Sequence, residues 1–147
     1  MKEFIIRQIN NNDYDKRYLE LLQKLTFIEP EKISREDFNI FIDNLNNNHI
    51  ILVIENSLIN IIIGTITILI EHKFIHNLGK VCHIEDVIID DDFRGLGLGK
   101  LLVNEAIEIS KKSLCYKTIL NCSNDNIIFY EKCGLIKNSV QMTLYNH

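Results

Sequence analysis

The chain has 147 residues, of which 46% are hydrophobic and 24% are charged, and its formal net charge is −4 at pH 7. These values are typical of one globular domain with an adequate hydrophobic core, so we expect a single domain over residues 1–147. The net negative charge disfavours nucleic acid as a partner, because binding a phosphate backbone requires clustered Lys and Arg, and the sequence has no such cluster.

The elements predicted from the hydrophobic pattern alternate between helices and strands. In chain order they are a strand at 4–9, helices at 13–25 and 34–45, strands at 50–55, 61–70 and 81–89, a helix at 100–113, a strand at 117–122, a helix at 126–133 and a strand at 140–145. Asp13 is expected to cap the first helix, and Ser34 with Asp37 resembles a capping box for the second. This order predicts an α/β fold of the α+β type, with a mixed twisted sheet flanked by helices.

The sequence predicts neither a targeting signal nor a membrane span. The segment Met1–Gln8 has no sustained apolar region, and the apolar run Ile59–Ile70 is shorter than the ~20 residues that a membrane helix needs. The cysteines form no CxxC pair, and we interpret them as reduced thiols; they are Cys82, Cys115, Cys122 and Cys133. We therefore expect a cytoplasmic protein without a membrane partner.

A glycine-rich segment joins the strand predicted at 81–89 to the helix that follows it. Its sequence is Arg94-Gly95-Leu96-Gly97-Leu98-Gly99-Lys100. A helix N-terminus presents unpaired N–H groups, and glycines let the backbone approach an anion closely. We interpret the segment as a phosphate cradle rather than as a capped turn alone, because basic residues stand at both of its ends.

The spacing of these residues distinguishes between the known phosphate-binding motifs. A Walker loop requires glycine where Arg94 stands and Ser or Thr where Leu101 stands. A Rossmann fingerprint requires its third glycine at Lys100, one residue later than the one found. The spacing that fits is Arg94-x-x-Gly97-x-Gly99, which resembles the pyrophosphate loop of the GNAT acetyltransferase superfamily.

Other segments strengthen this resemblance. Asn126–Leu135 is similar to the superfamily motif in which a helix carries a tyrosine, here Tyr130, beside the cofactor sulfur. The segments Glu71–His76, His83–Val87 and Cys115–Lys117 resemble the glucosamine 6-phosphate N-acetyltransferase family. That similarity covers roughly the half of the chain from Gly64 to Gly134.

The resemblance implies transfer of the acetyl group of acetyl-CoA to the amine of glucosamine 6-phosphate, by direct attack of the amine on the thioester. This step belongs to UDP-N-acetylglucosamine synthesis, and it requires neither a metal nor an enzyme nucleophile. The implied assembly is a homodimer whose interface includes the second strand and the C-terminal strand of the fold, and the substrate site borrows residues across that interface.

The resemblance also implies which residues do this work. The backbone N–H near Val87 polarises the thioester oxygen, Tyr130 donates to the leaving thiolate, and Asn121 stands where the substrate amine is oriented. The implied cofactor-binding residues are Val87, Ile88, Ile89, Arg94, Gly95, Leu96, Gly97, Leu98, Gly99, Lys100, Asn126 and Tyr130. The implied substrate-binding residues are Thr26, Lys73, Phe74, Ile75, His76, Glu85, Asp86, Val87, Tyr116, Lys117 and Asn121. Glu85 and Asp86 are neighbours on a predicted strand, so we expect their side chains to point to opposite faces.

Two departures from the family pattern leave other functions open. The family has a carboxylate at the position of Asn121, and an arginine near its C-terminus where this sequence has Tyr145. Asn accepts a hydrogen bond but carries no charge, and a phenol does not replace a bidentate arginine. The alternatives are therefore a GNAT enzyme for another amine, namely another amino sugar, a polyamine or a protein amine, and a catalytically silent acetyl-CoA-binding module.

Overall fold

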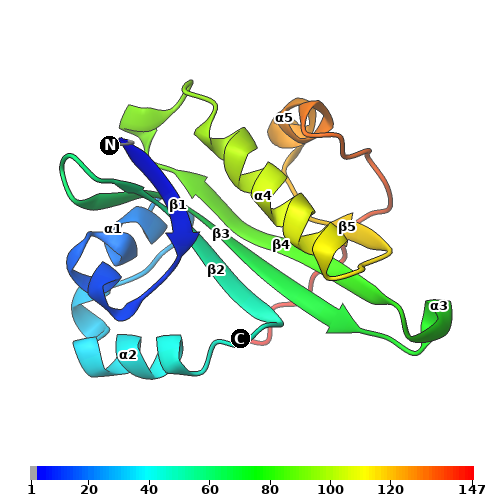
Figure 1. Cartoon of the computed structure of the whole chain (residues 1–147), viewed down its shortest axis with the longest axis horizontal. Helices are drawn as coiled ribbons and strands as arrows, with labels where there is room; N and C mark the ends of the chain where they lie inside the picture. The colour runs from blue at the N-terminus through cyan, green and yellow to red at the C-terminus, as the bar shows by residue number, and fades with distance from the viewer. Residues whose placement is uncertain (1–2) are drawn as a thin grey trace.

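The computed structural model describes residues 3–147 and contains a five-stranded sheet with the strand order β1-β2-β3-β4-β5. Its strands are β1 (Phe4–Gln8), β2 (His49–Asn56), β3 (Ile61–His72), β4 (Lys80–Ile89) and β5 (Lys117–Ile119). The first four strands run antiparallel to their neighbours, whereas β5 runs parallel to β4 (Figure 1). The predicted α+β fold with a mixed sheet is therefore confirmed.

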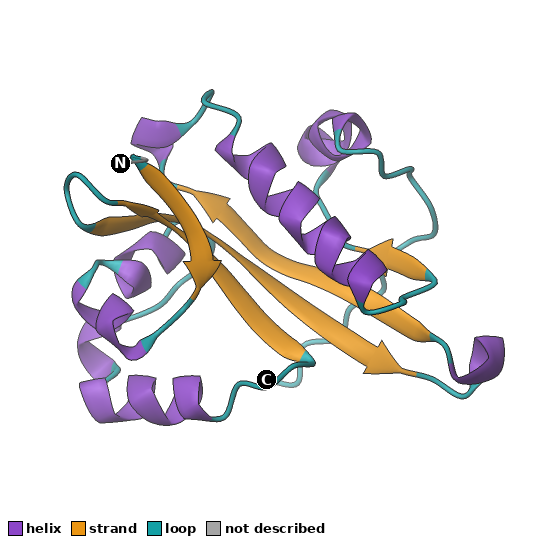
Figure 2. Cartoon of the chain, in the orientation of Figure 1, coloured by secondary structure: helices purple, strands orange, loops and turns teal. Residues whose placement is uncertain are grey.

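Helices cover both faces of this sheet (Figure 2). The helices are α1 (Tyr18–Leu22) and α2 (Arg35–Asp43) on one face, α4 (Leu98–Lys112) and α5 (Ile127–Lys132) on the other, and α3 (Ile75–Leu78) at the tip of the β3–β4 hairpin. Short 3-10 helices span Asn11–Asp15, Pro30–Lys32, Asp91–Phe93 and Asn124–Asn126. The capping box predicted for α2 is present, since the Ser34 hydroxyl accepts a hydrogen bond from the Asp37 N–H. Among residues 3–147, no helix is long and apolar enough to cross a lipid bilayer.

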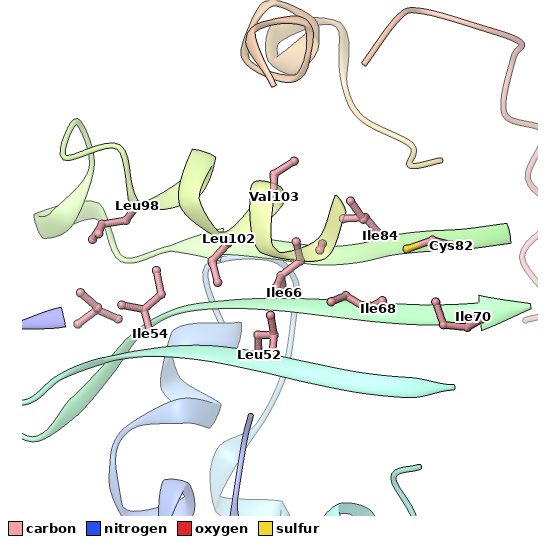
Figure 3. Packing of buried hydrophobic residues seen from close by; sticks show 12 residues of the cluster. Leu52, Ile54, Ile66, Ile68, Ile70, Cys82, Ile84, Leu98, Leu102 and Val103 are labelled. Atoms are coloured by element: carbon pink, nitrogen blue, oxygen red, sulfur yellow. The ribbon is translucent and has the colours of Figure 1, made fainter. Parts of the chain in front are cut away.

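Two hydrophobic clusters hold these layers together. Beneath α4, Leu102 and Val103 of the helix pack over Ile66 and Ile84 of the sheet (Figure 3). On the opposite face, the second cluster contains Phe38 of α2 together with side chains of α1 and the sheet. Strand β3 is buried at most of its positions, because helices cover both of its faces.

Strands β4 and β5 pair over a short length and then separate. Their paired residues are Val81–His83 on β4 and Lys117–Ile119 on β5. Beyond this point, the edge of β4 that faces β5 has no strand partner among the described residues. The separation opens the sheet between the two carboxyl-terminal strand ends, and it leaves this edge of β4 without a strand in residues 3–147 to pair with its backbone groups.

The helix predicted at 13–25 is broken in two. A 3-10 helix capped by Asn10 comes first, and α1 begins only after Arg17, whose φ of 62° interrupts the helical conformation. Asp13 is not the helix cap that we predicted. It is fully buried, and its carboxylate accepts hydrogen bonds from the Arg7 guanidinium at 2.9 and 2.7 Å. Asp13 therefore pairs with Arg7 of the preceding strand β1, and the helical conformation is interrupted at Arg17.

The strand predicted at 140–145 does not form. Residues 136–147 are irregular, and the apolar side chains of Val140, Met142 and Leu144 are each at least 84% exposed. The alternation of apolar residues is typical of a strand, but a strand also requires a backbone partner. No strand of the sheet in residues 3–147 pairs with this segment.

Candidate functional site

The turn between β4 and α4 presents free backbone N–H groups at the start of a helix. Gly95 and Gly97 have φ angles of 79° and 77°, in the left-handed region that favours glycine, and Gly97 is the N-cap of α4. The first helical hydrogen bond runs from the Leu101 N–H to the Gly97 carbonyl at 3.1 Å. Within residues 3–147, none of the N–H groups of residues 95–100 donates to a backbone carbonyl. These groups are therefore available to an anionic ligand.

The three glycines of this turn have different surroundings. A Cβ added to Gly95 or Gly97 would meet no atom within 4 Å, so the turn is open on that side. A Cβ on Gly99 would lie 3.2 Å from Cζ of Phe129, so glycine is needed there for close contact between α4 and α5. Phe129 packs edge-on against Tyr130, with ring centroids 4.9 Å apart. The predicted phosphate cradle and the predicted catalytic tyrosine are thus connected by packed side chains.

Basic side chains flank the turn. The Arg94 guanidinium forms an ion pair with Asp91 at 3.0 Å, and Lys24 contacts the same carboxylate at 3.1 Å. These cations, Lys24 more than Arg94, lower the pKa of Asp91. Arg94 is 62% exposed, and Lys100 at the start of α4 is exposed as well. Both predicted phosphate ligands are therefore at the surface beside the open N–H groups.

A cavity of about 320 Å³ lies where β4 and β5 separate. Its lining residues come from the loop after α1, from β4, from the segment between β5 and α5 and from α5 itself; they are Leu25, Ile84, Glu85, Asp86, Val87, Leu120, Asn121, Cys122, Ser123, Asn126 and Tyr130. Two of these side chains are carboxylates, and none is Lys or Arg. A second hollow, of about 430 Å³ beside α1, contains none of the predicted site residues. The first cavity favours a group that carries positive charge.

Tyr130 of α5 forms part of the wall of this cavity. Burial raises the pKa of its hydroxyl, and the nearby thiols of Cys122 and Cys133 add to the rise. The phenol is therefore protonated at neutral pH, as a proton donor must be. The helix that carries it ends at Gly134, whose φ is 96°, and the Leu135 N–H donates back to the Tyr130 carbonyl at 3.1 Å. The predicted stop at Gly134 is confirmed.

Glu85 and Asp86 both line the cavity, although we predicted opposite faces for them. The pairing of β3 with β4 shifts register between Thr65 and Thr67, opposite this pair of residues. Asp86 has a φ of 51°, which is left-handed and uncommon for a residue other than glycine. This bulge interrupts the alternation of a regular strand, so the expectation based on strict alternation was wrong.

The remaining predicted substrate residues form a separate group at the other end of β4. His76 stacks against Tyr116 with ring centroids 4.0 Å apart, and the Lys117 ammonium lies 5.8 Å from the Tyr116 ring. Lys73 forms an ion pair with Glu71 at 3.2 Å. None of the residues 73–76, 116 and 117 lines the cavity. Lys117 pairs with Val81 of β4, six positions before Val87, which places the two groups roughly 20 Å apart along the strand.

Some cavity residues were not predicted from the sequence. Thr26 is exposed and does not line the cavity, whereas its neighbour Leu25 does. Cys122 and Ser123 directly follow Asn121 and line the cavity with it. The proximity of these residues to predicted ones in the sequence was the only available signal. Which of them face the cavity depends on the course of the loops.

A model of the family described as "Acetyltransferase (GNAT) family" matches residues 12–135. The chain belongs to the GNAT acetyltransferase family. It is 40% identical over 145 residues to the glucosamine 6-phosphate N-acetyltransferase of Arabidopsis thaliana, covering 97% of this chain and 96% of that protein. It is 37% identical over 142 residues to the enzyme of the same name from Candida albicans, covering 95% and 93% of the two chains. The predicted resemblance is confirmed.

The solved structures agree with this assignment. The crystal structure of glucosamine-6-phosphate N-acetyltransferase from Arabidopsis thaliana matches this GNAT acetyltransferase with a TM-score of 0.95 and 39% identity, covering 99% and 100% of the two chains. GNAT acetyltransferases use acetyl-CoA. In residues 3–147 of this acetyltransferase, no group of three or more His, Cys, Asp or Glu side chains is arranged to hold a metal ion.

Proposed function

We propose that this acetyltransferase acetylates the 2-amino group of glucosamine 6-phosphate, giving N-acetylglucosamine 6-phosphate and CoA in the synthesis of UDP-N-acetylglucosamine. The observation that carries the proposal is the placement of Tyr130 in an acidic cavity beside an open strand edge and a glycine turn with free N–H groups. Identity of 40% over 97% of the chain to a glucosamine 6-phosphate N-acetyltransferase supports the substrate. We treat residues 1–147 as one domain and place it in the cytoplasm, in keeping with its four unpaired thiols.

The glycine turn and β4 would hold acetyl-CoA, which supplies an activated acetyl thioester. The N–H groups of residues 95–100 and the side chains of Arg94 and Lys100 would bind its pyrophosphate. The unpaired edge of Val87–Ile89 would hydrogen-bond to its pantetheine amides, as one more strand would. The open space above Gly95 and Gly97 supports this binding mode, because a phosphate can approach the backbone there.

The cavity would supply the groups that act on the reacting atoms. The Val87 N–H donates to the thioester oxygen as negative charge develops there. The Tyr130 hydroxyl, which its raised pKa keeps protonated at neutral pH, donates its proton to the leaving sulfur. The amine nitrogen loses one proton as the amide forms, and this proton restores the phenol through solvent. Asn121 accepts a hydrogen bond from the acceptor amine through its side-chain oxygen.

We propose a homodimer, because the cavity of one chain has no cation for a sugar phosphate. The cationic residues Lys73 and Lys117 stand at the distant end of β4, in the group with Tyr116 and His76. In a dimer, this group of one chain and the C-terminal residues 136–147 would approach the cavity of the other. The exposed apolar residues of that segment support its burial against a partner.

The oligomeric state tests the dimer directly. Light scattering on the intact chain should give twice the monomer mass of 17.2 kDa. Replacement of an exposed C-terminal apolar side chain, Met142→Glu, should shift the mass toward that of one chain and raise the KM for the sugar phosphate. A monomeric wild-type protein at micromolar concentration would remove this part of the proposal.

The substrate is tested by thiol release with acetyl-CoA and a panel of amines at equal concentration. The panel comprises glucosamine 6-phosphate, glucosamine, spermidine and a lysine peptide. We expect the highest kcat/KM for glucosamine 6-phosphate, because specificity is a ratio of kcat/KM values. A higher value for another amine would favour the second candidate function, to which Asn121 and Tyr145 point. Binding of CoA without turnover on any amine would indicate a silent module.

A further inference from the structure

The charge of the acceptor amine requires a partner that Asn121 cannot provide. The nitrogen of a primary amine becomes positively charged as it attacks a carbonyl carbon, and a nearby carboxylate lowers the energy of that state. Asn121 offers a hydrogen-bond acceptor of similar shape but no charge. Among the residues that line the cavity, only Glu85 and Asp86 are negatively charged.

The backbone distinguishes these two carboxylates. Asp86 has a φ of 51°, a left-handed conformation that is uncommon outside glycine and that Asp and Asn adopt more readily than other residues. It sits in the bulge where β4 shifts register against β3. Strain of this kind persists where the surrounding structure enforces it, and it is concentrated at functional sites. Because the bulge turns a strand position toward the cavity, it brings a short carboxylate to the cavity wall.

Asp86 shares its cavity with the groups that are proposed to act on the substrate. Leu25, from the loop after α1, lines this cavity together with Asp86, Asn121 and Tyr130. On α1 itself, Tyr18 is only 6% exposed. Burial raises the pKa of Tyr18, and the negative charge of Asp86 contributes to the rise.

We infer that Asp86 is the catalytic carboxylate of this chain: it accepts a hydrogen bond from the acceptor amine and offsets the positive charge that Asn121 leaves uncompensated. The inference rests on the proposed function, since it assigns a role within the same cavity. It predicts that a carboxylate at either position 86 or position 121 can offset the charge of the amine. One carboxylate is needed, and in this chain position 86 supplies it instead of position 121.

The test is a set of four variants compared with the wild type: Asp86→Asn, Glu85→Gln, Asn121→Asp and the double variant Asp86→Asn/Asn121→Asp. Asn tolerates left-handed backbone, so the first substitution removes the charge and keeps the conformation. We expect Asp86→Asn to lower kcat for glucosamine 6-phosphate about 100-fold, in the range of a positioned polar catalytic group. The kcat of Glu85→Gln should be at least tenfold higher than that of Asp86→Asn. The kcat of the double variant should also be at least tenfold higher than that of Asp86→Asn.

Binding of CoA, measured by calorimetry, separates this role from a structural one. The affinity of CoA for Asp86→Asn should stay within threefold of wild type, because the glycine turn is untouched. If Asp86→Asn does not fold, Asp86→Gly serves instead, since glycine adopts the same φ without strain. An inactive wild type would remove the proposed function itself. An active wild type with a kcat loss below threefold in Asp86→Asn, or a double variant no better than Asp86→Asn, would overturn the inference alone.

Discussion

Gly97 provides the most direct test of the proposed cofactor site. Its φ of 77° is left-handed, and a Cβ at this position would meet no protein atom within 4 Å. Replacement by alanine therefore creates no clash inside the protein. The left-handed conformation destabilises the folded alanine variant by about 1–2 kcal/mol. The reduced conformational freedom of alanine in the unfolded state offsets about 0.4–1 kcal/mol of this loss. We expect Gly97→Ala to lower the free energy of unfolding by about 1 kcal/mol.

The effect of this substitution on cofactor affinity should be larger. The added methyl group occupies the open space over the N–H groups of residues 95–100, where the pyrophosphate would bind. Loss of one hydrogen bond to a charged group costs about 1.5–3 kcal/mol. That loss corresponds to an increase in the Kd for CoA of roughly 10- to 150-fold. Isothermal calorimetry with CoA measures this change, and thermal melting measures the stability.

Gly134 offers a matched control. It also has a positive φ, 96°, and a Cβ there would again meet no atom within 4 Å. Gly134→Ala should therefore also lower the free energy of unfolding, since alanine disfavours a positive φ at either position. Its CoA affinity should remain close to wild type. If Gly97→Ala binds CoA as tightly as Gly134→Ala does, the N–H groups at the start of α4 are not the phosphate site.

The other predictions concern the tyrosine, its packing and the pH dependence of stability. Tyr130→Phe should lower kcat about 100-fold without changing the Kd for CoA, because it removes only the proton donor; equal kcat values would contradict this role. Gly99→Ala should lower both the melting temperature and kcat, because the new Cβ would press on Phe129 at 3.2 Å; an unchanged kcat would separate the α4–α5 contact from catalysis. Hydrogen bonding from Lys16, together with Arg7, lowers the pKa of Glu55. The contribution of Glu55 to the free energy of unfolding is therefore present above about pH 4.5 and is lost as the pH falls through the lowered pKa. Melting curves between pH 3 and 7 should show a smaller acid loss for Glu55→Gln than for wild type, and parallel curves would refute this.

Local sequence patterns determined most of the fold and the cofactor turn. β-Branched runs identified strands β2 and β3, and the spacing of Gly97 and Gly99 placed the predicted phosphate cradle at the start of α4. These features depend on residues close in sequence, so their physical causes can be recognised without knowledge of the fold. The helix stop at Gly134 was recognisable for the same reason, whereas the role predicted for Tyr130 came from the resemblance to the family.

Tertiary structure alone decided the shape of the cavity and the residues that share it. The separation of β5 from β4, the bulge that turns Asp86 inward and the distance between Lys117 and the cavity all arise from pairing between remote segments. The helix predicted over residues 13–25 is interrupted by the left-handed backbone of Arg17, and Asp13 pairs with Arg7 of β1. Residues 140–145 likewise have the alternating pattern of a strand but do not form one. A strand forms only where another backbone satisfies its hydrogen bonds.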